Sequence, residues 1–476
     1  MYTEDCEILA VDLDGTLLRT DMLYESFFAA LSHNWCTPLH SAKALISGPA
    51  SLKRYLASAG VVDVSTLPYN EAVISYIIAW RRSGGRVVLV TASDQIIAEA
   101  IAEHLGIFDE VHGSNPKLNL KGENKASFLE NHFGIKAFAY MGDSAVDLSV
   151  WKRAQAAITV QASYNLRRKT ELACENVEHL SCNEKSFIPY VNTLRPHQWL
   201  KNILVFLPIL AAHRLEYYAL TSSLLAFICF CMIASSVYIL NDLLDLASDR
   251  AHPRKKFRPF ACGKVPIVNG VLMASTLIGL GLAFSTFIGR YFFAMILMYF
   301  IITILYSFKL KRIVIIDVYI LSLLYSIRIC AGAAATLTPL SVWLLAFSIF
   351  FFLSLAAVKR QAELVDHATR GKQIPSGRGY HTDDLTIITM IAIGAGLMSV
   401  LVMMLYVQSP SVSLLYNRPD LLWGVSLVLL YWIINIIMVS HRGYMDDDPI
   451  VFAVKDRKSQ VCLFIIVMFI LASVIE

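Results

Sequence analysis

The 476-residue chain is short of charge and of the patterns that mark several common protein classes. Only 16% of its residues are charged and 56% are apolar, which is too apolar for an ordinary soluble protein. The formal net charge of +4 is too small to indicate a nucleic acid partner. Glycine-rich phosphate loops, internal repeats and low-complexity tracts are absent. The sequence therefore excludes nucleic-acid binding, P-loop nucleotide binding and repeat architectures.

The cysteines and the amino-terminal segment exclude two further interpretations. Nine cysteines are scattered without metal-ligand spacing, and Cys229 and Cys231 lie inside an apolar run, so we expect unpaired packing residues. Residues 1–7 are acidic and lack the apolar stretch of a secretory signal. We therefore expect the amino-terminal domain to stay in the cytoplasm.

Long apolar runs occur only in the carboxyl-terminal part of the chain. Residues 1–186 mix charged and apolar residues as a globular domain does, and we expect a second domain at 187–476. Runs long enough to span a bilayer, or nearly so, occur at 203–220, 221–240, 267–288, 291–308, 314–335, 340–358, 385–407, 420–440 and 460–475. The first is the shortest and contains Pro208. The pattern predicts an all-α polytopic membrane bundle of nine transmembrane helices.

The basic residues between these runs predict the orientation. If the amino-terminal domain is cytoplasmic, the loops at 241–266, 309–313, 359–384 and 441–459 are cytoplasmic too, and they carry 18 Lys or Arg residues. The opposite loops carry only Arg214, Arg290 and Arg418. This bias follows the positive-inside rule and favours an odd number of spans.

A line of oxygen-bearing side chains follows the second apolar run. Asn241, Asp245 and Asp249 are four residues apart, so on a helix they share one face. Oxygen ligands of this kind suit Mg²⁺, through which a protein can hold a diphosphate. Five basic residues between positions 250 and 258 could neutralise the phosphate oxygens that the metal leaves free. At a membrane edge, this indicates an enzyme that acts on a diphosphate and a lipid.

Other polar clusters fall on the same predicted side, at 195–202, 306–309, 359–366, 377–380 and 447–459. Orientation does not explain their carboxylates, because Asp and Glu contribute little to it. Arg328 lies inside an apolar run, where an ionised group is costly and is a functional candidate. Alternatively, it forms a structural pair with Asp317 or with a backbone carbonyl.

These motifs resemble the UbiA-type intramembrane prenyltransferase superfamily, and within it the polyprenyl-phosphate phosphoribosyltransferases, over about 190–476. The motifs are Arg-Pro-x-Gln-Trp-x-Lys-Asn from residue 195, Asn-Asp-x-x-Asp-x-x-x-Asp-x-x-His-Pro from 241, Lys-Arg-x-x-Glu-Leu from 359 and the loop from Asp448 to Arg457. The resemblance implies nine helices around a central cavity, with two cytoplasmic acidic motifs that bind Mg²⁺-diphosphate. Members with aromatic acceptors have two aspartates four apart in the second motif. Here Glu363 and Asp366 are three apart, which favours the phosphoribosyl branch.

The resemblance also implies a role for each matching residue. It assigns Mg²⁺-diphosphate to Asn241, Asp242, Asp245 and Asp249, with Asp245 and Asp249 also counted as catalytic. It assigns substrate phosphates to Lys201, Lys255, Arg258, Tyr306, Lys309, Lys359 and Arg360. Glu363 is expected to hold a second metal ion or the ribose hydroxyls.

The amino-terminal domain has a separate series of motifs. Residues 8–16 predict a short buried strand that ends in Asp12 and Asp14, which strand alternation points in the same direction. Thr91 follows a second apolar strand, Lys125 opens a helix, and Asp143 and Asp147 follow a third strand. This series resembles the haloacid dehalogenase superfamily over about residues 5–180. The resemblance implies an α/β Rossmann-like domain with a small helical cap at about 22–68.

In that family's mechanism, Asp12 attacks phosphorus and Asp14 acts as general acid and base. Thr91 and Lys125 would bind the transferring phosphoryl group. Asp12, Asp143 and Asp147 would hold Mg²⁺.

Together, the two halves predict a bifunctional multi-pass enzyme of the cell (inner) membrane with both active sites cytoplasmic. The membrane domain would transfer phosphoribose from phosphoribosyl pyrophosphate to polyprenyl (decaprenyl) phosphate, and the amino-terminal domain would remove the 5-phosphate. In one alternative, a polyprenyl group moves from its diphosphate to an aromatic acceptor. In another, the chain is a membrane scaffold or transporter with a regulatory phosphatase-like domain.

Overall fold

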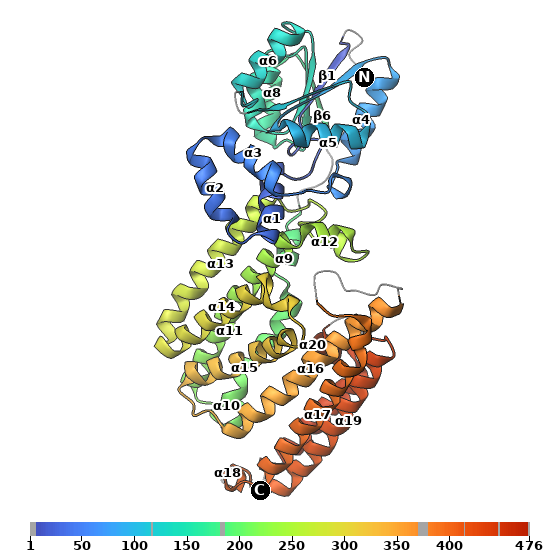
Figure 1. Cartoon of the computed structure of the whole chain (residues 1–476). Coiled ribbons are helices and arrows are strands. Elements are labelled where there is room, and N and C mark those ends of the chain that lie inside the picture. Colours follow the sequence, from blue (N-terminus) through green and yellow to red (C-terminus); the bar gives the residue numbers. More distant parts are fainter. Residues whose placement is uncertain are drawn as a thin grey trace. The chain divides into compact units, whose positions relative to one another are not determined.

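The computed structural model describes residues 6–115, 118–180, 186–369, 379–413, 415–445 and 448–474, which form two compact units (Figure 1). The first unit contains the chain up to Thr193 together with Ile239–Met273. The second contains Leu194–Tyr238 and the chain from Ala274 onward. The domain boundary between residues 186 and 187 stays a prediction. The structure adds that the segment Ile239–Met273, which follows the second apolar run, belongs to the amino-terminal unit.

A six-stranded parallel sheet forms the centre of the first unit, with strand order β3-β2-β1-β4-β5-β6. The strands are β1 (Ile8–Val11), β2 (Arg86–Asp94), β3 (Glu110–Ser114), β4 (Ala139–Gly142), β5 (Ala156–Val160) and β6 (Asn176–Leu180). The strand order reverses direction at β1, and in such sheets ligands bind beyond the carboxyl ends of the strands at this point. The α/β Rossmann-like prediction is confirmed.

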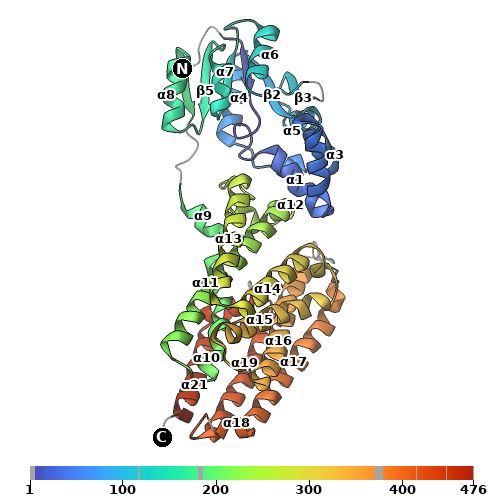
Figure 2. The ribbon, with the colours of Figure 1, turned by 90° about the vertical axis from the view of Figure 1, so that its left-hand side faces the viewer.

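Both faces of this sheet are covered by helices, because its strands are apolar on both sides (Figure 2). Leu9 and Leu89 point to the core shared with α4 (Glu71–Arg82) and α5 (Gln95–Leu105). Ala10 and Val88 point to the opposite core. That core is formed with α6 (Glu123–Phe133), α7 (Leu148–Trp151) and α8 (Tyr164–Ala173). Burial on two faces therefore fixes where each strand ends.

A helical insertion follows β1, as predicted for the cap. It comprises α1 (Met22–His33), α2 (Thr37–Ile46), α3 (Pro49–Ala59) and the short 3-10 helix η1 (Val64–Thr66). Asp21 caps α1 by accepting a hydrogen bond from the backbone N–H of Leu23 at 2.9 Å. The short 3-10 helix η2 (Ala145–Asp147) lies after β4, and α9 (Ile188–Thr193) ends the amino-terminal portion of this unit.

The segment Ile239–Met273 begins inside α11 (Tyr217–Leu244) and ends inside α13 (Ile267–Ile288). Between them are α12 (Leu246–Ala251) and the 3-10 helix η4 (Lys255–Phe257). Asp245 separates α11 from α12 with a non-helical backbone (φ −99°, ψ 13°). Aspartate favours such end positions because its side chain competes for backbone hydrogen bonds. The helical spacing of Asn241, Asp245 and Asp249 is therefore interrupted at the middle residue.

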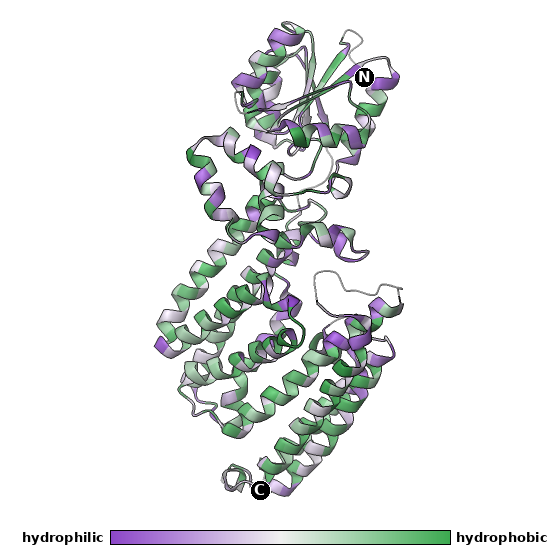
Figure 3. Ribbon diagram, viewed as in Figure 1, coloured by the Kyte–Doolittle hydropathy of each residue, from purple (hydrophilic) through white to green (hydrophobic). Residues whose placement is uncertain are grey.

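The second unit is almost entirely helical, and apolar residues dominate its helices (Figure 3). Its long helices besides α11 and α13 are α14 (Arg290–Phe308), α15 (Ile316–Thr336), α16 (Val342–Thr369), α17 (Leu385–Val407), α19 (Leu422–His441) and α21 (Arg457–Val474). Shorter elements are η3 (Pro196–Phe206), α10 (Leu207–Ala211), η5 (Leu310–Arg312), η6 (Thr382–Asp384), α18 (Pro410–Ser413), η7 (Pro419–Leu421) and α20 (Pro449–Lys455).

Within the described residues, eight helices are long and apolar enough to cross a membrane. Seven of the nine predicted runs correspond directly to α13–α17, α19 and α21, and the run at 221–240 lies in α11. The first predicted run instead forms η3 and α10, because its apolar stretch is short and Pro208 lies near its centre. The polytopic α-helical membrane bundle is confirmed, whereas the ninth span is not.

Helix α15 lies deepest among these helices. In its most apolar stretch of 18 residues 67% of the residues are buried, whereas the corresponding share in α21 is 17%. One cluster joins α15 to α16, α17 and α19. A second cluster joins it to η3, α11 and α14. Gly332 permits the close approach to η3, since a Cβ atom at this position would lie 2.0 Å from the backbone oxygen of Val205.

We predict that Gly332→Ala destabilises the second unit. The added methyl group meets backbone rather than a movable side chain, and overpacking of this kind costs about 1–3 kcal/mol. Thermal unfolding in detergent measures the effect. The matched control is Gly394→Ala in α17, where a Cβ atom meets nothing within 4 Å and the better helix propensity of alanine should keep or raise the midpoint. Equal midpoints for the two variants would contradict the prediction.

Candidate functional sites

The predicted phosphatase residues meet beyond the carboxyl ends of β1, β2 and β4. Lys125, in the first turn of α6, donates from Nζ to Oδ1 of Asp12 at 2.8 Å and to the hydroxyl of Tyr140 at 2.9 Å. Tyr140 in turn donates to Oδ1 of Asp147 at 3.0 Å. The side chains of Lys125 and Asp12 are 3% and 12% exposed, so the ion pair is shielded from water. Three predicted side chains are thus held near the β1 switch point, and Tyr140, which was not predicted, joins two of them.

Asp14 accepts two hydrogen bonds from different parts of the first unit. Its Oδ1 accepts from the backbone N–H of Met22 at 2.7 Å, and its Oδ2 accepts from the hydroxyl of Ser93 at 2.7 Å. Burial, opposed by these hydrogen bonds, raises the pKa of Asp14 to about 7. A carboxyl group with this pKa can both give and take a proton near neutral pH. The geometry therefore suits the general acid and base predicted from sequence.

Thr91 is completely buried at the carboxyl end of β2. Its hydroxyl oxygen accepts a hydrogen bond from the backbone N–H of Ser93 at 3.0 Å. This contact lies where the pairing of β2 with β3 is irregular, between Val90 and Asp94, and Ser93 there reaches Asp14.

Asp12, Asp143 and Asp147 form a set of oxygen ligands that fits a divalent cation. One oxygen from each lies within 4.8 Å of the others, and hard oxygen ligands suit Mg²⁺. Burial and the charges of Asp12 and Asp147 raise the pKa of Asp143 to about 8, because three carboxylates repel one another. Gly15, with φ +75°, leaves room for Asp143, whose Oδ2 would lie 2.2 Å from a Cβ atom there.

A second group of possible ligands consists of Glu110, His112 and His132. The Nε2 atoms of both histidines lie 3.2 Å from Oε2 of Glu110, and Arg86 pairs with its other oxygen. Histidine spacing alone gave no sign of this group, because His132 comes from α6 and His112 from β3. These partners satisfy the carboxylate without a metal ion.

The acidic segment 241–249, which joins the end of α11 to α12, is organised by Arg258. Its Nη1 donates to Oδ1 of Asp242 at 3.0 Å and to Oδ2 of Asp249 at 2.6 Å. Burial raises the pKa of Asp249 to about 6, whereas Arg258 and Lys255 lower it. Arg258 was predicted to contact phosphate, and the structure places it on two predicted metal ligands. A metal ion and this guanidinium would neutralise the same carboxylates.

The other predicted ligands of this segment lie close along the chain. The backbone N–H groups of Asp245 and Asp249 donate to the carbonyls of Asn241 and Asp245 at 2.9 and 2.8 Å, so the spacing stays nearly helical across the break. Oδ1 of Asn241 is buried and, among the described residues, has no hydrogen-bond partner. An oxygen that lacks a donor fits the predicted ligand role.

Arg250 and Lys255 differ in the exposure of their charged groups to solvent. Arg250 was one of the five basic residues predicted to neutralise phosphate, but it pairs with both oxygens of Glu25 in α1. Lys255 is exposed in η4, as a phosphate contact requires. The prediction for Arg250 is therefore wrong, because a buried carboxylate occupies its guanidinium.

In the second unit, Asp448 joins two of the predicted phosphate-binding lysines. Its Oδ2 accepts from Nζ of Lys201 at 2.6 Å and from Nζ of Lys359 at 3.0 Å. The side chains of Asp448 and Lys201 are 5% and 9% exposed. The lysines were predicted individually, and their shared carboxylate was not. The Asp-Pro pair of Asp448 and Pro449 at the start of α20 is its sequence signal.

A second polar group surrounds Arg360 of α16, which is fully buried. Its guanidinium contacts Asp317 at 2.9 Å and also pairs with Glu363. Tyr306 donates to Oδ1 of Asp317 at 3.1 Å. Arg360, Glu363 and Tyr306 were predicted separately, as contacts of phosphate, metal or ribose, and those roles stay predictions. Asp317, considered only as a partner of Arg328, instead contacts Arg360 and Tyr306. Its signal was an acidic residue inside an apolar run.

Arg328 and Lys309 occupy contrasting environments. Arg328 is buried and donates to Oδ1 of Asn202, to the hydroxyl of Tyr299, both at 2.9 Å, and to the carbonyl of Leu324. The alternative of a backbone carbonyl partner is confirmed, and Asp317 is not its partner. Lys309 lies exposed after α14, outside these hydrogen-bonded groups. Residues 377, 378 and 447, which belong to predicted polar clusters, lie outside the described residues.

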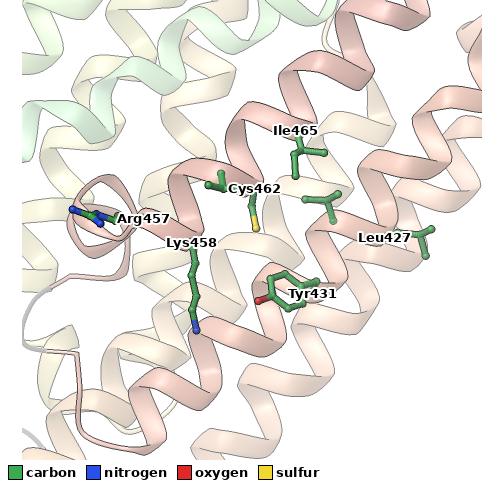
Figure 4. Close-up of a pocket in the computed structure, with 8 residues that line it drawn as sticks. Leu427, Tyr431, Arg457, Lys458, Cys462 and Ile465 are labelled. Atoms are coloured by element: carbon green, nitrogen blue, oxygen red, sulfur yellow. The ribbon is translucent and has the colours of Figure 1, made fainter.

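A cavity of about 440 Å³ lies between α19 and α21 (Figure 4). It is lined by Leu427, Val428, Tyr431, Arg457, Lys458, Val461, Cys462 and Ile465. No carboxylate is among these residues, so the cavity is separate from the acidic groups described above.

We predict that Asp143→Asn stabilises the metal-free protein at pH 8. The raised pKa of Asp143 means that the folded protein keeps a proton that the unfolded chain has lost, so stability falls as pH rises from about 4 to about 8. The asparagine variant lacks this loss. In EDTA its unfolding midpoint should exceed that of the wild type by about 3 °C or more at pH 8.

Magnesium provides the second half of this measurement. Mg²⁺ should raise the midpoint of the wild type and have little effect on Asp143→Asn. Glu110→Gln, in the other ligand group, is the control and should keep the full magnesium response. Equal magnesium responses in wild type and Asp143→Asn would show that these oxygens do not hold the ion.

Two family patterns match the chain. Residues 203–452, more than half of the chain, match the UbiA prenyltransferase family, and residues 9–152 match the haloacid dehalogenase-like hydrolases. An uncharacterized protein of Sinorhizobium fredii, y4nM, is 35% identical over 95% of this chain and 88% of its own length.

Relatives whose names state an activity match shorter regions of this chain. A decaprenyl-phosphate phosphoribosyltransferase of Mycolicibacterium smegmatis is 39% identical over 37% of this chain and 56% of its own length, so the alignment spans about half of that relative. Among solved structures, a UbiA homologue from Archaeoglobus fulgidus bound to GPP and Mg²⁺ aligns with 59% of this chain and 99% of its own, at 16% identity and a TM-score of 0.46. The matched segment 203–452 and the near-complete alignment to the Sinorhizobium protein establish that this chain, with its amino-terminal haloacid dehalogenase-like domain, belongs to the UbiA prenyltransferase family.

Proposed function

We propose that the membrane domain transfers phosphoribose from phosphoribosyl pyrophosphate to a polyprenyl phosphate, and that the amino-terminal domain then removes the 5-phosphate. One observation carries the proposal. The first compact unit contains both Asp12 with its neighbours Lys125, Asp143 and Asp147 and the acidic segment with Asp242 and Asp249. The similarity of the membrane domain to decaprenyl-phosphate phosphoribosyltransferases supports the choice of substrates.

In the transfer step, a phosphate oxygen of the lipid forms a bond to the anomeric carbon as the bond from that carbon to pyrophosphate breaks. Bound Mg²⁺ would neutralise the departing pyrophosphate, a role that fits Asn241, Asp242, Asp245 and Asp249 as ligands. Lys201, Lys255 and Lys359 would contact the phosphates, and Arg258 would orient the acidic ligands. The attacking phosphate is already ionised, so the step needs no strong base.

In the hydrolysis step, a carboxylate oxygen of Asp12 bonds to phosphorus and the bond from phosphorus to the ribose oxygen breaks. Asp14 gives its proton to that oxygen and then takes one from the water that releases phosphate. Lys125 neutralises charge on Asp12 and on the phosphoryl group. The result is polyprenyl-phosphoryl ribose, free phosphate and unchanged enzyme.

The orientation in the cell membrane is part of the proposal. Loops that carry 18 basic residues would face the cytoplasm, and loops that carry three would face the opposite side. Both substrates' phosphate groups and the amino-terminal domain would then be on the cytoplasmic side.

A second candidate is transfer of a polyprenyl group from its diphosphate to an aromatic acceptor, which the name of the matched family favours. The two reactions differ in which substrate carries the diphosphate. Purified protein with Mg²⁺ should convert radiolabelled phosphoribosyl pyrophosphate and polyprenyl phosphate into labelled lipid. Labelling only from an isoprenyl diphosphate with an aromatic acceptor would replace the phosphoribosyl proposal with the second candidate.

Asp12→Asn should make the 5-phosphorylated lipid accumulate. The amide cannot attack phosphorus, whereas the acidic segment 241–249 is unchanged, so the first step continues. Mass spectrometry of the lipid fraction should show the product heavier by one phosphate and little dephosphorylated lipid. Dephosphorylation at the wild-type rate would exclude Asp12 as the nucleophile.

Asp249→Asn should lower the rate of lipid labelling roughly 100-fold or more, because it removes a charged ligand of the Mg²⁺ that would neutralise the departing pyrophosphate. Asp420→Asn is the control, since Asp420 is exposed in η7 on the opposite predicted side of the membrane. Hydrolysis of p-nitrophenyl phosphate reports whether the amino-terminal domain remains folded. Unchanged lipid labelling in Asp249→Asn would exclude the metal role of this segment.

A further inference from the structure

A buried ion pair connects the acidic segment to the cap helix within the first unit. Arg250 of α12 donates from Nη2 to Oε1 of Glu25 at 2.6 Å and from Nη1 to Oε2 at 3.1 Å. The two side chains are 5% and 3% exposed, and the residues are 225 positions apart in sequence. A bidentate pair fixes direction as well as distance.

Neighbouring groups satisfy the remaining capacity of this pair. Oε1 of Glu25 also accepts from the hydroxyl of Thr20 at 2.7 Å, and Nε of Arg250 donates to the carbonyl of Ala261 at 3.0 Å. Two buried charges are costly to remove from water unless their hydrogen bonds are complete. The ion pair is therefore a built contact with a defined geometry.

A second contact, independent of charge, joins the same two segments. Gly263 has φ +69°, and a Cβ atom there would lie 2.7 Å from Cβ of Arg19 and 3.0 Å from its carbonyl oxygen. Pro68 closes the same space at 3.3 Å. The loop after η4 thus rests directly on the residues that lead from Asp14 into the cap.

Each end of the ion pair is close to a functional carboxylate along the chain. Glu25 lies in the first turn of α1, whose first residue, Met22, donates its backbone N–H to Asp14. Arg250 follows Asp249, which shares Arg258 with Asp242. A displacement of α12 relative to α1 would therefore reach both Asp14 and Asp249.

We propose that Arg250 and Glu25 are positioning residues for both reactions. Arg250 holds the first turn of α1, and so the backbone N–H that orients Asp14. Glu25 holds α12, and so the carboxylate of Asp249. This proposal rests on the proposed function, and its phosphatase half requires only that the amino-terminal domain hydrolyse a phosphomonoester. Neither residue contacts the reacting atoms.

Glu25→Gln and Arg250→Gln, alone and combined in full-length protein, test the proposal. Arg250→Gln should lower kcat for p-nitrophenyl phosphate about 10-fold with little change in KM, since it misorients Asp14 but leaves the phosphoryl contacts. Glu25→Gln should lower lipid labelling about 10-fold and raise the Mg²⁺ concentration needed for half-maximal rate. The double variant should lose no more than the worse single variant, because both remove one interaction.

Matched substitutions separate positioning from general damage. Glu103→Gln and Arg82→Gln change the same residue types at exposed sites in α5 and α4 and should leave all rates within twofold. Hydrogen exchange should accelerate at the amides of Met22 and Leu23 in Arg250→Gln and stay slow in β4. Unchanged rates in both single variants, or losses that add in the double variant, would overturn the proposal.

The two proposals fail in different ways. If the wild type forms no lipid-linked ribose while Arg250→Gln still slows p-nitrophenyl phosphate hydrolysis, the proposed function is wrong and the positioning of Asp14 by Arg250 stands. If lipid-linked ribose forms and Arg250→Gln hydrolyses p-nitrophenyl phosphate at the wild-type rate, the proposed function stands and the positioning role is wrong.

Discussion

The cost of removing carboxylates from water is the constraint on which both units depend. Five of the buried acidic groups are held by a cation from another element or from a later segment: Asp12 by Lys125, Asp242 and Asp249 by Arg258, Asp317 by Arg360, and Asp448 by two lysines. Unpaired, such groups would take up protons or unfold the chain around them. The pairs therefore allow acidic residues to stay ionised at depth, which is the state that a metal ion or a phosphoryl group requires.

Asp143 shows what happens where a neighbouring cation compensates a carboxylate only in part. It has no lysine of its own and faces Asp12 and Asp147, so its pKa is raised to about 8. Lys125 lowers that pKa without cancelling the effect. The phosphatase site is thus incompletely neutralised, which favours a divalent cation at the place where three oxygens meet. In the acidic segment, Arg258 already supplies part of the positive charge.

The roles of the phosphatase residues stay predictions, whereas the sequence was sufficient for the sheet and the cap, because short buried strands and the motifs that follow β1 and β4 mark the order of the elements. It was also sufficient for most membrane spans, since length and hydropathy decide them. The sequence did not predict contacts in which the two partners come from distant segments. Nothing local to Arg250 indicates Glu25, and nothing local to Lys201 indicates Asp448. The interruption at Asp245 was also not predictable, because the spacing of residues does not report where a helix ends.

The ion pair between α12 and α1 also joins segments from the two sides of the predicted domain boundary at residue 186. A polypeptide that began after residue 186 would contain Arg250 without its partner Glu25. One that ended at residue 186 would contain Glu25 without Arg250. In each shortened chain, water would have to solvate a charged group that is buried in the full-length protein. Splitting the gene at this point should thus yield less soluble fragments unless a compensating substitution accompanies the cut.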